Sequence, residues 1–285
     1  MAIATKPPRI LITGASGYVG ARLYADLKAL FPTYGTYNRS RKTELLMLDI
    51  GDREMTRAVA AETRPDIIVH VAAVASSKEC EQNPAIANHV NVSGTANVVS
   101  AANECGSKLV YISTEFAAGP SDTLGETKLS GESAAMKAEA GWVIVRPVQL
   151  IGQSPNLNGR FQQQLFDNIS KGTPAVYDNS EAFQVAHIWQ LSRLVAMAAN
   201  AEVPIYGNVI PLSTNGMRTK LQIAEDLFSH PILREHKITV SASGSKSTRK
   251  RIELPTTPAL SIGIDVDYCH AIDATAKEIA EALRK

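Results

Sequence analysis

The sequence of 285 residues is poor in cysteine, in aromatic residues and in net charge. Its three cysteines, Cys80, Cys105 and Cys269, are widely spaced and odd in number, so we expect neither a disulfide framework nor a metal site. The formal net charge is only +1, which gives no reason to expect binding to nucleic acid or to an anionic membrane. No apolar run approaches the roughly 20 residues of a membrane-spanning helix.

The remaining composition is that of a globular protein. Apolar residues make up 45% and charged residues 20% of the chain, and the length suffices for a full hydrophobic core. The first nine residues are polar and contain Pro7-Pro8, which argues against a secretory signal. We therefore expect a cytoplasmic location.

A short apolar run followed by three regularly spaced glycines is the most informative feature of the sequence. Residues 10–13 are typical of a buried first strand, and a helical pattern of apolar residues follows at Val19, Leu23, Leu27 and Leu30. Glycines between such elements let the backbone turn sharply and approach a ligand, and the helix N-terminus favours a phosphate. A purely structural turn is the alternative. We predict a dinucleotide-binding loop with contacts from Gly14, Ser16, Gly17, Tyr18, Val19 and Gly20.

Strand-like and helix-like segments alternate through the first half of the chain. Strands are predicted to end near Asn38 and to cover residues 45–48, 66–71, 108–113 and 142–146, and helices to cover 53–63 and 126–138, with a long helix opening at Asn83. This alternation predicts an α/β fold with a Rossmann-type, doubly wound parallel sheet.

The regularity drops after Pro147. Residues 152–159 are typical of a loop, Thr219–Gln222 fits a capping box, and residues 274–283 predict a closing helix. We predict a dinucleotide-binding Rossmann domain over residues 1–150. A smaller C-terminal lobe over residues 151–285 would mainly bind substrate, with some elements returning to the first domain.

The loop after the second strand favours NADP(H). It contains Asn38, Arg39 and Ser40, then two further cations, and has no carboxylate. An acidic residue at this point binds the ribose hydroxyl of NAD, whereas arginine accommodates the 2′-phosphate of NADP. We predict NADP(H) contacts from Asn38, Arg39 and Ser40, with NAD(H) as the second choice. A solvated basic loop is the structural alternative.

Further motifs give the chain a family resemblance. They cover residues 13–20, 48–50, 64–73, 81–84, 90–95, 111–115 and 125–132. The sequence resembles the extended short-chain dehydrogenase/reductases, and most of all their dTDP-4-dehydrorhamnose reductase branch. The match is good over the first 150 residues and fainter beyond them, where His187-Ile188 and residues 258–262 only suggest it.

The resemblance implies further cofactor contacts. Asp49 and Ile50 would flank the adenine, and Ala72 and Ala73 would border the centre of the cofactor. Ser113, at the end of the fifth strand, joins this set. Related enzymes often pair through helices that flank the sheet, so the resemblance also suggests a homodimer.

The resemblance also implies roles near the reacting atoms. Lys128 would hydrogen-bond the nicotinamide ribose, and Thr114 would face the substrate carbonyl. Asn91 would be a structural or proton-relay asparagine, with ordinary packing as the alternative for Asn91 and Thr114. His70 and His187 lie in or beside apolar segments, and we interpret both as core histidines.

One position departs from the family pattern. These reductases place a tyrosine four residues before the lysine on one helix, where the lysine lowers the tyrosine pKa and the phenol delivers a proton to the carbonyl. Lys128 is present, but the position four residues before it is Leu124, which cannot donate a proton. The segment over residues 119–123 is also shorter than the family's loop, which leaves the substrate open.

Three interpretations follow from this departure. On the first interpretation the chain reduces a sugar-like or other small carbonyl compound, and a nucleotide-linked substrate is one form of it. The acid would then be Thr114, Glu115 or a distant tyrosine such as Tyr177. Burial beside the nicotinamide would raise the pKa of Glu115 enough for that role. Alternatively, the chain catalyses a different reaction, or binds the cofactor without turnover and acts through a partner. On the first interpretation, the catalytic residues are Thr114, Glu115 and Lys128.

A basic cluster over residues 246–251 is the remaining charged feature. It predicts either a phosphate clamp or an acidic partner's docking patch, and a solvated loop is the simpler alternative.

Overall fold

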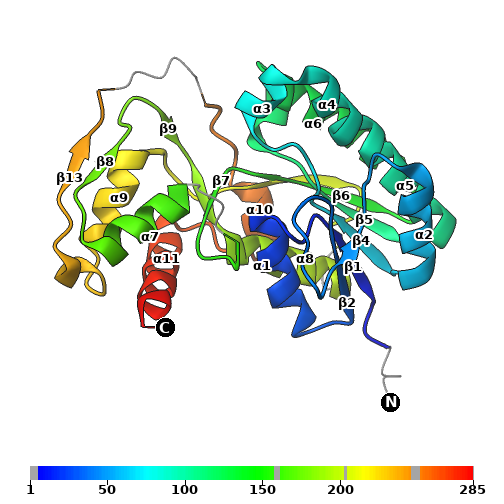
Figure 1. The fold of residues 1–285 in the computed structure, drawn as a ribbon, viewed down its shortest axis with the longest axis horizontal. Helices are drawn as coiled ribbons and strands as arrows, with labels where there is room; N and C mark the ends of the chain where they lie inside the picture. The colour runs from blue at the N-terminus through cyan, green and yellow to red at the C-terminus, as the bar shows by residue number, and fades with distance from the viewer. Residues whose placement is uncertain (1–5, 157–160, 202–203, 245–250, 285) are drawn as a thin grey trace. The chain divides into compact units, whose positions relative to one another are not determined.

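The structure, a computed structural model, describes residues 6–156, 161–201, 204–244 and 251–284 (Figure 1). The chain divides into two compact units. The first comprises Met1–Arg146 and Ser192–Ile210, and the second comprises Pro147–Leu191 and Pro211–Lys285.

The described residues of the first unit are built around a seven-stranded sheet, in the order β11-β6-β5-β4-β1-β2-β3. The neighbours from β6 to β3 pair in parallel. Strands β1 and β4 are buried at every position, as continuous apolar strands of a parallel sheet covered on both faces should be. The predicted Rossmann-type fold is therefore confirmed. The strands are β1 Ile10–Thr13, β2 Thr33–Tyr37, β3 Leu46–Met47, β4 Ile67–His70, β5 Lys108–Ile112, β6 Trp142–Pro147 and β11 Asn208–Leu212.

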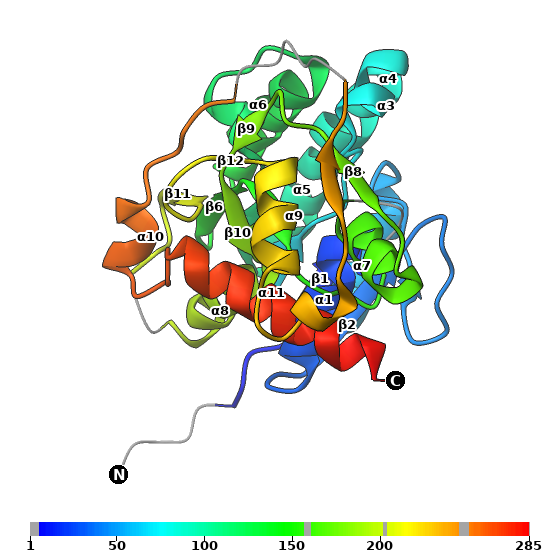
Figure 2. The ribbon, with the colours of Figure 1, turned by 90° about the vertical axis from the view of Figure 1, so that its left-hand side faces the viewer.

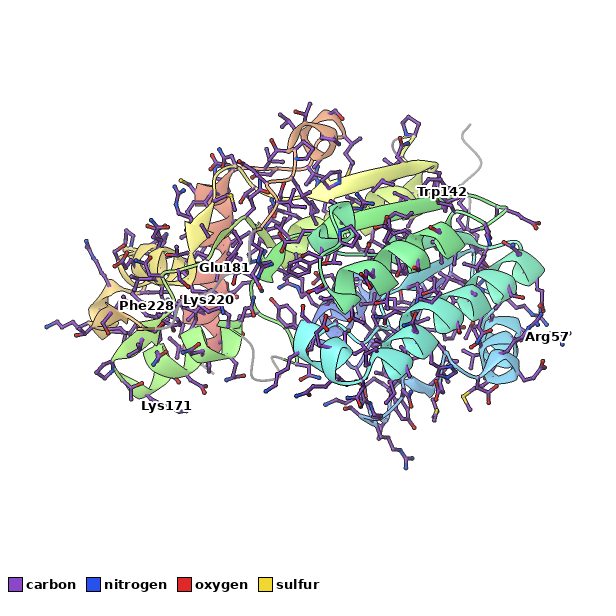
Figure 3. All side chains as sticks on the ribbon, turned by 90° about the horizontal axis from the view of Figure 1, so that it is seen from above. Arg57, Trp142, Lys171, Glu181, Lys220 and Phe228 are labelled. Atoms are coloured by element: carbon purple, nitrogen blue, oxygen red, sulfur yellow. The ribbon has the colours of Figure 1, made fainter. Side chains whose placement is uncertain are left out.

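Helices cover the two faces of this sheet. Helices α2 (Arg53–Thr63), α5 (Thr95–Cys105) and α6 (Thr123–Ala135) pack side by side over one face. Arg57 on α2 forms an ion pair of 2.9 Å with Glu104 on α5 and is labelled in Figure 3. Helix α1 (Tyr18–Lys28) packs on β1 and β2, and α8 is Ile188–Asn200.

The long helix predicted from Asn83 is interrupted. It consists of α4 (Pro84–Asn88), a π-helical turn η1 (His89–Gly94) and then α5. A short helix α3 (Ser77–Gln82), which was not predicted, precedes it. Such π turns insert an extra residue per turn and occur frequently at functional sites.

Two helix boundaries on the first unit differ from the prediction. Helix α1 ends at Lys28, so Leu30 is not on its buried face and is 63% exposed. Helix α6 begins at Thr123 rather than at residue 126, because the Asp122 carboxylate accepts the Gly125 N–H at 2.8 Å and caps the helix. The first turn of α6 therefore contains Leu124.

The second unit combines short strand pairs with helices. Its core contains Tyr177, whose ring packs between those of Phe161 and Phe228. Helix α9 packs on β8, β13 and α11, as Figure 2 shows. The elements are β7 Gln149–Ile151, α7 Phe161–Lys171, β8 Ala175–Tyr177, β9 Ala182–Phe183, β10 Val185–His187, β12 Arg218–Thr219, α9 Lys220–Phe228, η3 Arg234–His236, β13 Val240–Ala242, α10 Thr257–Ser261 and α11 Tyr268–Leu283.

Two local predictions on the second unit can be compared with its helices. The capping box at the start of α9 is confirmed, since the side chain of Thr219 accepts the Gln222 N–H and the side chain of Gln222 accepts the Thr219 N–H. The closing helix α11 begins at Tyr268, six residues earlier than predicted, because the Asp267 side chain caps it. Within the described parts of the chain, the helices are all too short or too polar to span a membrane.

Candidate functional site

The residues predicted to bind cofactor and substrate lie in the first unit, where neighbouring parallel strands end. Strand β1 lies between β4 and β2, so the glycine loop is flanked by the ends of both. In open α/β sheets, ligands bind at this edge. The candidates follow β1 (Gly14, Ser16, Gly17, Tyr18, Val19, Gly20), β2 (Asn38, Arg39, Ser40), β3 (Asp49, Ile50), β4 (Ala72, Ala73) and β5 (Ser113, Thr114, Glu115).

The glycine loop is packed closely against the end of β4. Gly14 has a φ of 70°, and a Cβ atom there would lie 2.8 Å from the Ala72 Cα atom. The Gly17 N–H donates to the Gly14 carbonyl at 3.0 Å, and Gly17 is the N-cap of α1, whose first turn has no acidic residue. The loop therefore brings bare backbone and the positive end of a helix dipole to the sheet edge, which suits a pyrophosphate.

A buried hydrogen-bond chain fixes the loop and the end of β4 together. The Thr13 hydroxyl accepts the N–H groups of Val71 and Ala72 at 3.1 and 3.2 Å. It lies 2.7 Å from His70 Nδ1, so it donates its own proton there. His70 Nε2 then donates to the Thr95 hydroxyl at 3.1 Å. His70 links two loops of the candidate site to α5.

His70 is held in its neutral form. Its side chain is fully buried, and burial lowers its pKa to about 3, with the charge of Lys128 acting in the same direction. Both ring nitrogens are hydrogen-bonded. The interpretation of His70 as a core histidine is confirmed.

The loop after β2 is exposed. The Arg39 side chain is 83% exposed, and its guanidinium lies 3.8 Å from the Glu79 carboxylate of α3. A single exposed ion pair of this length contributes little stability. Arg39 can therefore leave Glu79 for a stronger anion.

Asp49 and Ile50 differ in their surroundings. The Asp49 carboxylate accepts the Gly51 N–H at 2.9 Å and is partly buried. Ile50 is 4% exposed and packs against Gly94 of η1, where a Cβ atom would lie 2.9 Å from its side chain. Ile50 therefore belongs to the core beneath the loop as well as to its edge.

Asn91 is a positioning residue. Its side-chain oxygen accepts the Val74 N–H at 2.8 Å, and its amide nitrogen donates to the Val74 carbonyl and to the Thr127 hydroxyl, both at 3.1 Å. The π turn η1 carries this side chain inward, where it fixes the segment after β4 to helix α6. Thr127 directly precedes Lys128.

Lys128 is buried at the end of β5. Its ammonium donates to the Ile112 carbonyl at 2.7 Å and lies 4.2 Å from the centre of the Tyr111 ring. Burial lowers the pKa of Lys128 to about 7, and the charge of Glu132 works against this change. The Lys128 ammonium therefore lies at the carboxyl end of β5, the edge where open α/β sheets bind their ligands.

Leu124 lies on the same helix, one turn before Lys128, but in apolar surroundings. Its side chain is 5% exposed and forms a cluster with Val74, Cys80 and Ala87, which we call the Leu124 cluster. The Cys80 thiol donates to the Val74 carbonyl at 3.4 Å, and burial raises its pKa. The side chain four positions before Lys128 is therefore part of a small apolar core.

Thr114 and Glu115 follow the carbonyl that receives Lys128. Thr114 is partly buried, and its hydroxyl accepts the Phe116 N–H at 3.5 Å at the start of the short helix η2 (Glu115–Ala118). Glu115 is 4% exposed. The structure places both at the carboxyl end of β5, where the sequence predicted them.

A buried ion pair behind this strand end was not predicted. The Ser113 hydroxyl donates to Glu132 at 2.5 Å, and Arg146 donates to both Glu132 oxygens at 2.9 and 2.6 Å. The Ser113 hydroxyl, predicted as a cofactor contact, thus has a partner inside the protein. Glu132 and Arg146 are 14 residues apart on different elements, so no local spacing in the sequence indicates this pair.

Other predicted residues lie in the second unit. Tyr177 is 2% exposed, and its hydroxyl donates to Asn168 at 2.8 Å. Burial also raises the pKa of the Tyr177 phenol. Tyr177 is therefore a core residue of the second unit and not a candidate for the acid of the reaction. His187 is fully buried, accepts the Trp189 N–H at 3.2 Å and lies 3.2 Å from Glu278, which confirms it as a core histidine.

The basic cluster falls mostly outside the described residues, which omit 245–250. Its last member, Arg251, forms an ion pair with Glu181.

The comparisons with known proteins establish the family. The sequence profile of the RmlD substrate binding domain matches residues 8–246, so the chain belongs to this family. Methionine adenosyltransferase 2 subunit beta of Mus musculus is 24% identical over 276 residues, covering 90% of this chain and 83% of the relative. A dTDP-4-dehydrorhamnose reductase of Streptomyces griseus is 32% identical over 161 residues, covering 51% of each protein.

Solved structures agree with this assignment. The crystal structure of a dTDP-4-dehydrorhamnose reductase from Bacillus anthracis, in complex with NADP, has a TM-score of 0.80 at 21% identity. The alignment covers 98% of this chain and 100% of that chain. At this identity the likeness shows the fold. The resemblance predicted from the sequence is confirmed.

The burial of Lys128 predicts a pH-dependent stability. As the pH rises from 7 to about 10, the folded protein progressively loses the Lys128 proton, whereas the unfolded chain, with a lysine pKa of 10.5, retains it. The unfolded state then binds more protons, so the stability that Lys128 contributes rises with pH, by at most about 1.4 kcal/mol per pH unit. The free energy of unfolding of the wild type minus that of Lys128→Met, from urea denaturation, should rise through this window.

Lys137→Met, which removes an exposed lysine just past α6, is the matched control. A difference between wild type and Lys128→Met that stays constant from pH 7 to pH 10 would show that Lys128 is not held in a desolvated site.

Proposed function

We propose that this protein binds NADP(H) and reduces a sugar-like or other small carbonyl compound. The observation that carries the proposal is the joint retention of the glycine loop and the buried Lys128 at one sheet edge. Membership of the RmlD substrate binding domain family supports it. The Bacillus anthracis structure, described as a complex with NADP, supports the choice of cofactor.

The residues at the edge fit a dinucleotide. Side chains at Gly14 or Gly20 would clash with the protein's own backbone, since a Cβ atom would lie 2.8 Å from the Ala72 Cα atom and 2.2 Å from the Gly14 carbonyl oxygen, so glycine at these two positions lets the loop turn closely against β4. Backbone N–H groups from Ser16 to Gly20 would bind the pyrophosphate. Asn38, Arg39 and Ser40 would bind the adenosine ribose and its 2′-phosphate, Asp49 and Ile50 would flank the adenine, and Ala72, Ala73 and Ser113 would border the cofactor's centre.

The chemistry is divided between cofactor and chain. When bound, NADPH supplies the hydride for reduction of a carbonyl carbon. Lys128 would hold the nicotinamide ribose from its position under the end of β5. With Leu124 in place of the phenol, Thr114 would hydrogen-bond the carbonyl oxygen and Glu115 would deliver the proton.

A second candidate is a cofactor-binding subunit without turnover, which acts through a partner protein. The Leu124 cluster favours it, because loss of a positioned acid costs about 10²–10⁴ in rate. The mouse relative, which matches 90% of this chain, is by name a subunit of methionine adenosyltransferase 2. A different reaction on the same fold is the third option.

Cofactor choice provides the first test. We expect the purified protein to bind NADPH more tightly than NADH in a fluorescence titration. Arg39→Ala should weaken NADPH binding about tenfold, since a charged hydrogen bond to the 2′-phosphate is lost, and leave NADH binding unchanged. Arg234→Ala, an exposed arginine of the second unit, is the control. An equal loss of affinity for NADPH and NADH in Arg39→Ala would exclude Arg39 as the contact to the 2′-phosphate. If the wild-type protein bound neither nucleotide, the proposal would be overturned.

The assignment of Glu115 as the acid provides the second test. With NADPH and dTDP-4-dehydrorhamnose, the substrate in the name of the Streptomyces griseus relative, Glu115→Gln should lower kcat about 10²–10⁴-fold. NADPH affinity should stay unchanged, as it should in the control Glu126→Gln, an exposed position on α6. Unchanged turnover in Glu115→Gln would remove Glu115 from the mechanism.

A further inference from the structure

The ion pair behind Lys128 has no part in the function proposed above. Glu132 lies on α6 one turn after Lys128 and is 1% exposed. One of its oxygens accepts both the Ser113 hydroxyl and the Arg146 Nε–H, and the other accepts an Arg146 N–H at 2.6 Å. A carboxylate this deeply buried is stable only because its oxygens are satisfied.

The same bonds fix the strand end that receives Lys128. Ser113 follows Ile112, whose carbonyl accepts the Lys128 ammonium at 2.7 Å. Glu132 thus holds the residue next to this carbonyl, while its own helix carries the lysine. Arg146, on β6, ties the arrangement to the neighbouring strand.

Four groups act on Lys128 or lie against it. Strand β5 contributes the Tyr111 ring, β4 the neutral His70, α3 the Cys80 thiol and α6 the Glu132 carboxylate. Among these four groups, Glu132 is the one carboxylate. The Arg146 side chain, which balances it, is 20% exposed, so water screens the arginine charge more than the buried carboxylate.

We propose that Glu132 is the positioning residue of Lys128: fixed by Ser113 and Arg146, its carboxylate keeps the buried ammonium populated at neutral pH and aligned with the Ile112 carbonyl. One part of the inference rests on the proposed function, namely that the charged Lys128 contacts the bound cofactor. Because position 124, one turn before Lys128 on α6, holds a leucine and not a phenol, the charge of Lys128 would serve cofactor binding.

The test is the titration of Lys128 itself, followed by NMR on the full chain with isotope-labelled lysine and assigned with Lys128→Arg. Glu132→Gln keeps the size of the side chain and removes its charge. The titration midpoint of Lys128 should move down by about one pH unit. Glu126→Gln removes the same charge from an exposed position of α6 and should leave the midpoint in place.

Arg146→Met provides a test of opposite sign. It leaves the Glu132 charge unbalanced, so the Lys128 midpoint should move up, and the midpoint of the double variant Glu132→Gln/Arg146→Met should lie between those of Glu132→Gln and the wild type. A merely structural role would move both single variants in the same direction or neither. If Arg146→Met does not fold, Glu132→Gln against Glu126→Gln decides, and an unchanged midpoint in Glu132→Gln overturns the proposal.

The titration needs no cofactor, so the two proposals fail separately. A shifted midpoint in a protein that binds neither NADPH nor NADH would sustain the role of Glu132 and overturn the proposed function. An unshifted midpoint in a protein that binds NADPH would do the reverse.

Discussion

The hydrogen bond from the Lys128 ammonium to the Ile112 carbonyl joins helix α6 to the end of strand β5, and the candidate site is arranged around this contact. A lysine can be buried there only if the helix begins early enough to carry it to the strand end. The Asp122 cap sets that beginning. Asn91 then fixes the neighbouring residue Thr127 to the segment after β4. The glycine loop reaches the same segment through Thr13 and His70, so loop, strand ends and helix form one hydrogen-bonded frame.

Within this frame the candidate cofactor side has a close-packed glycine loop, whereas the position four residues before Lys128 holds a leucine. The close approach of Gly14 to Ala72 and the helix N-terminus at Gly17 are what a dinucleotide requires. The Leu124 cluster places packed apolar side chains where the family resemblance led us to expect a phenol. A reductase can tolerate this change only if another group delivers the proton, whereas a binding subunit needs no such group. The choice between the two candidate functions therefore depends on the acid and not on the fold.

Local patterns made much of the fold predictable. The apolar runs of β1 and β4, the glycine loop and the Thr219 capping box each depend on neighbouring residues, and the structure has them where the sequence indicated. Helix ends were less predictable because caps compete with apolar spacing: Leu30 continues the spacing of α1 but lies beyond its end. The π turn η1 is a tertiary effect, since the bonds of Asn91 are made to residues 17 and 36 positions away.

The candidate site divides in the same way. Gly14 and Arg39 were predicted from the spacing of a dinucleotide-binding motif, and Lys128 was predicted from the family resemblance. The partnership of Ser113, Glu132 and Arg146 joins two strands and a helix, so no short segment of sequence contains it. Tyr177 could be removed as an acid only once its burial in the second unit was known.

The most direct test of the account is transfer of deuterium from NADPH labelled at the transferable position of the nicotinamide. Wild-type protein would be mixed with the labelled cofactor and a panel of sugar-like carbonyl compounds that includes dTDP-4-dehydrorhamnose, and the products analysed by mass spectrometry. The account predicts an alcohol product that carries the deuterium on the former carbonyl carbon. Tight binding of NADPH without transfer to any compound of the panel would contradict the reductase assignment and favour the binding subunit.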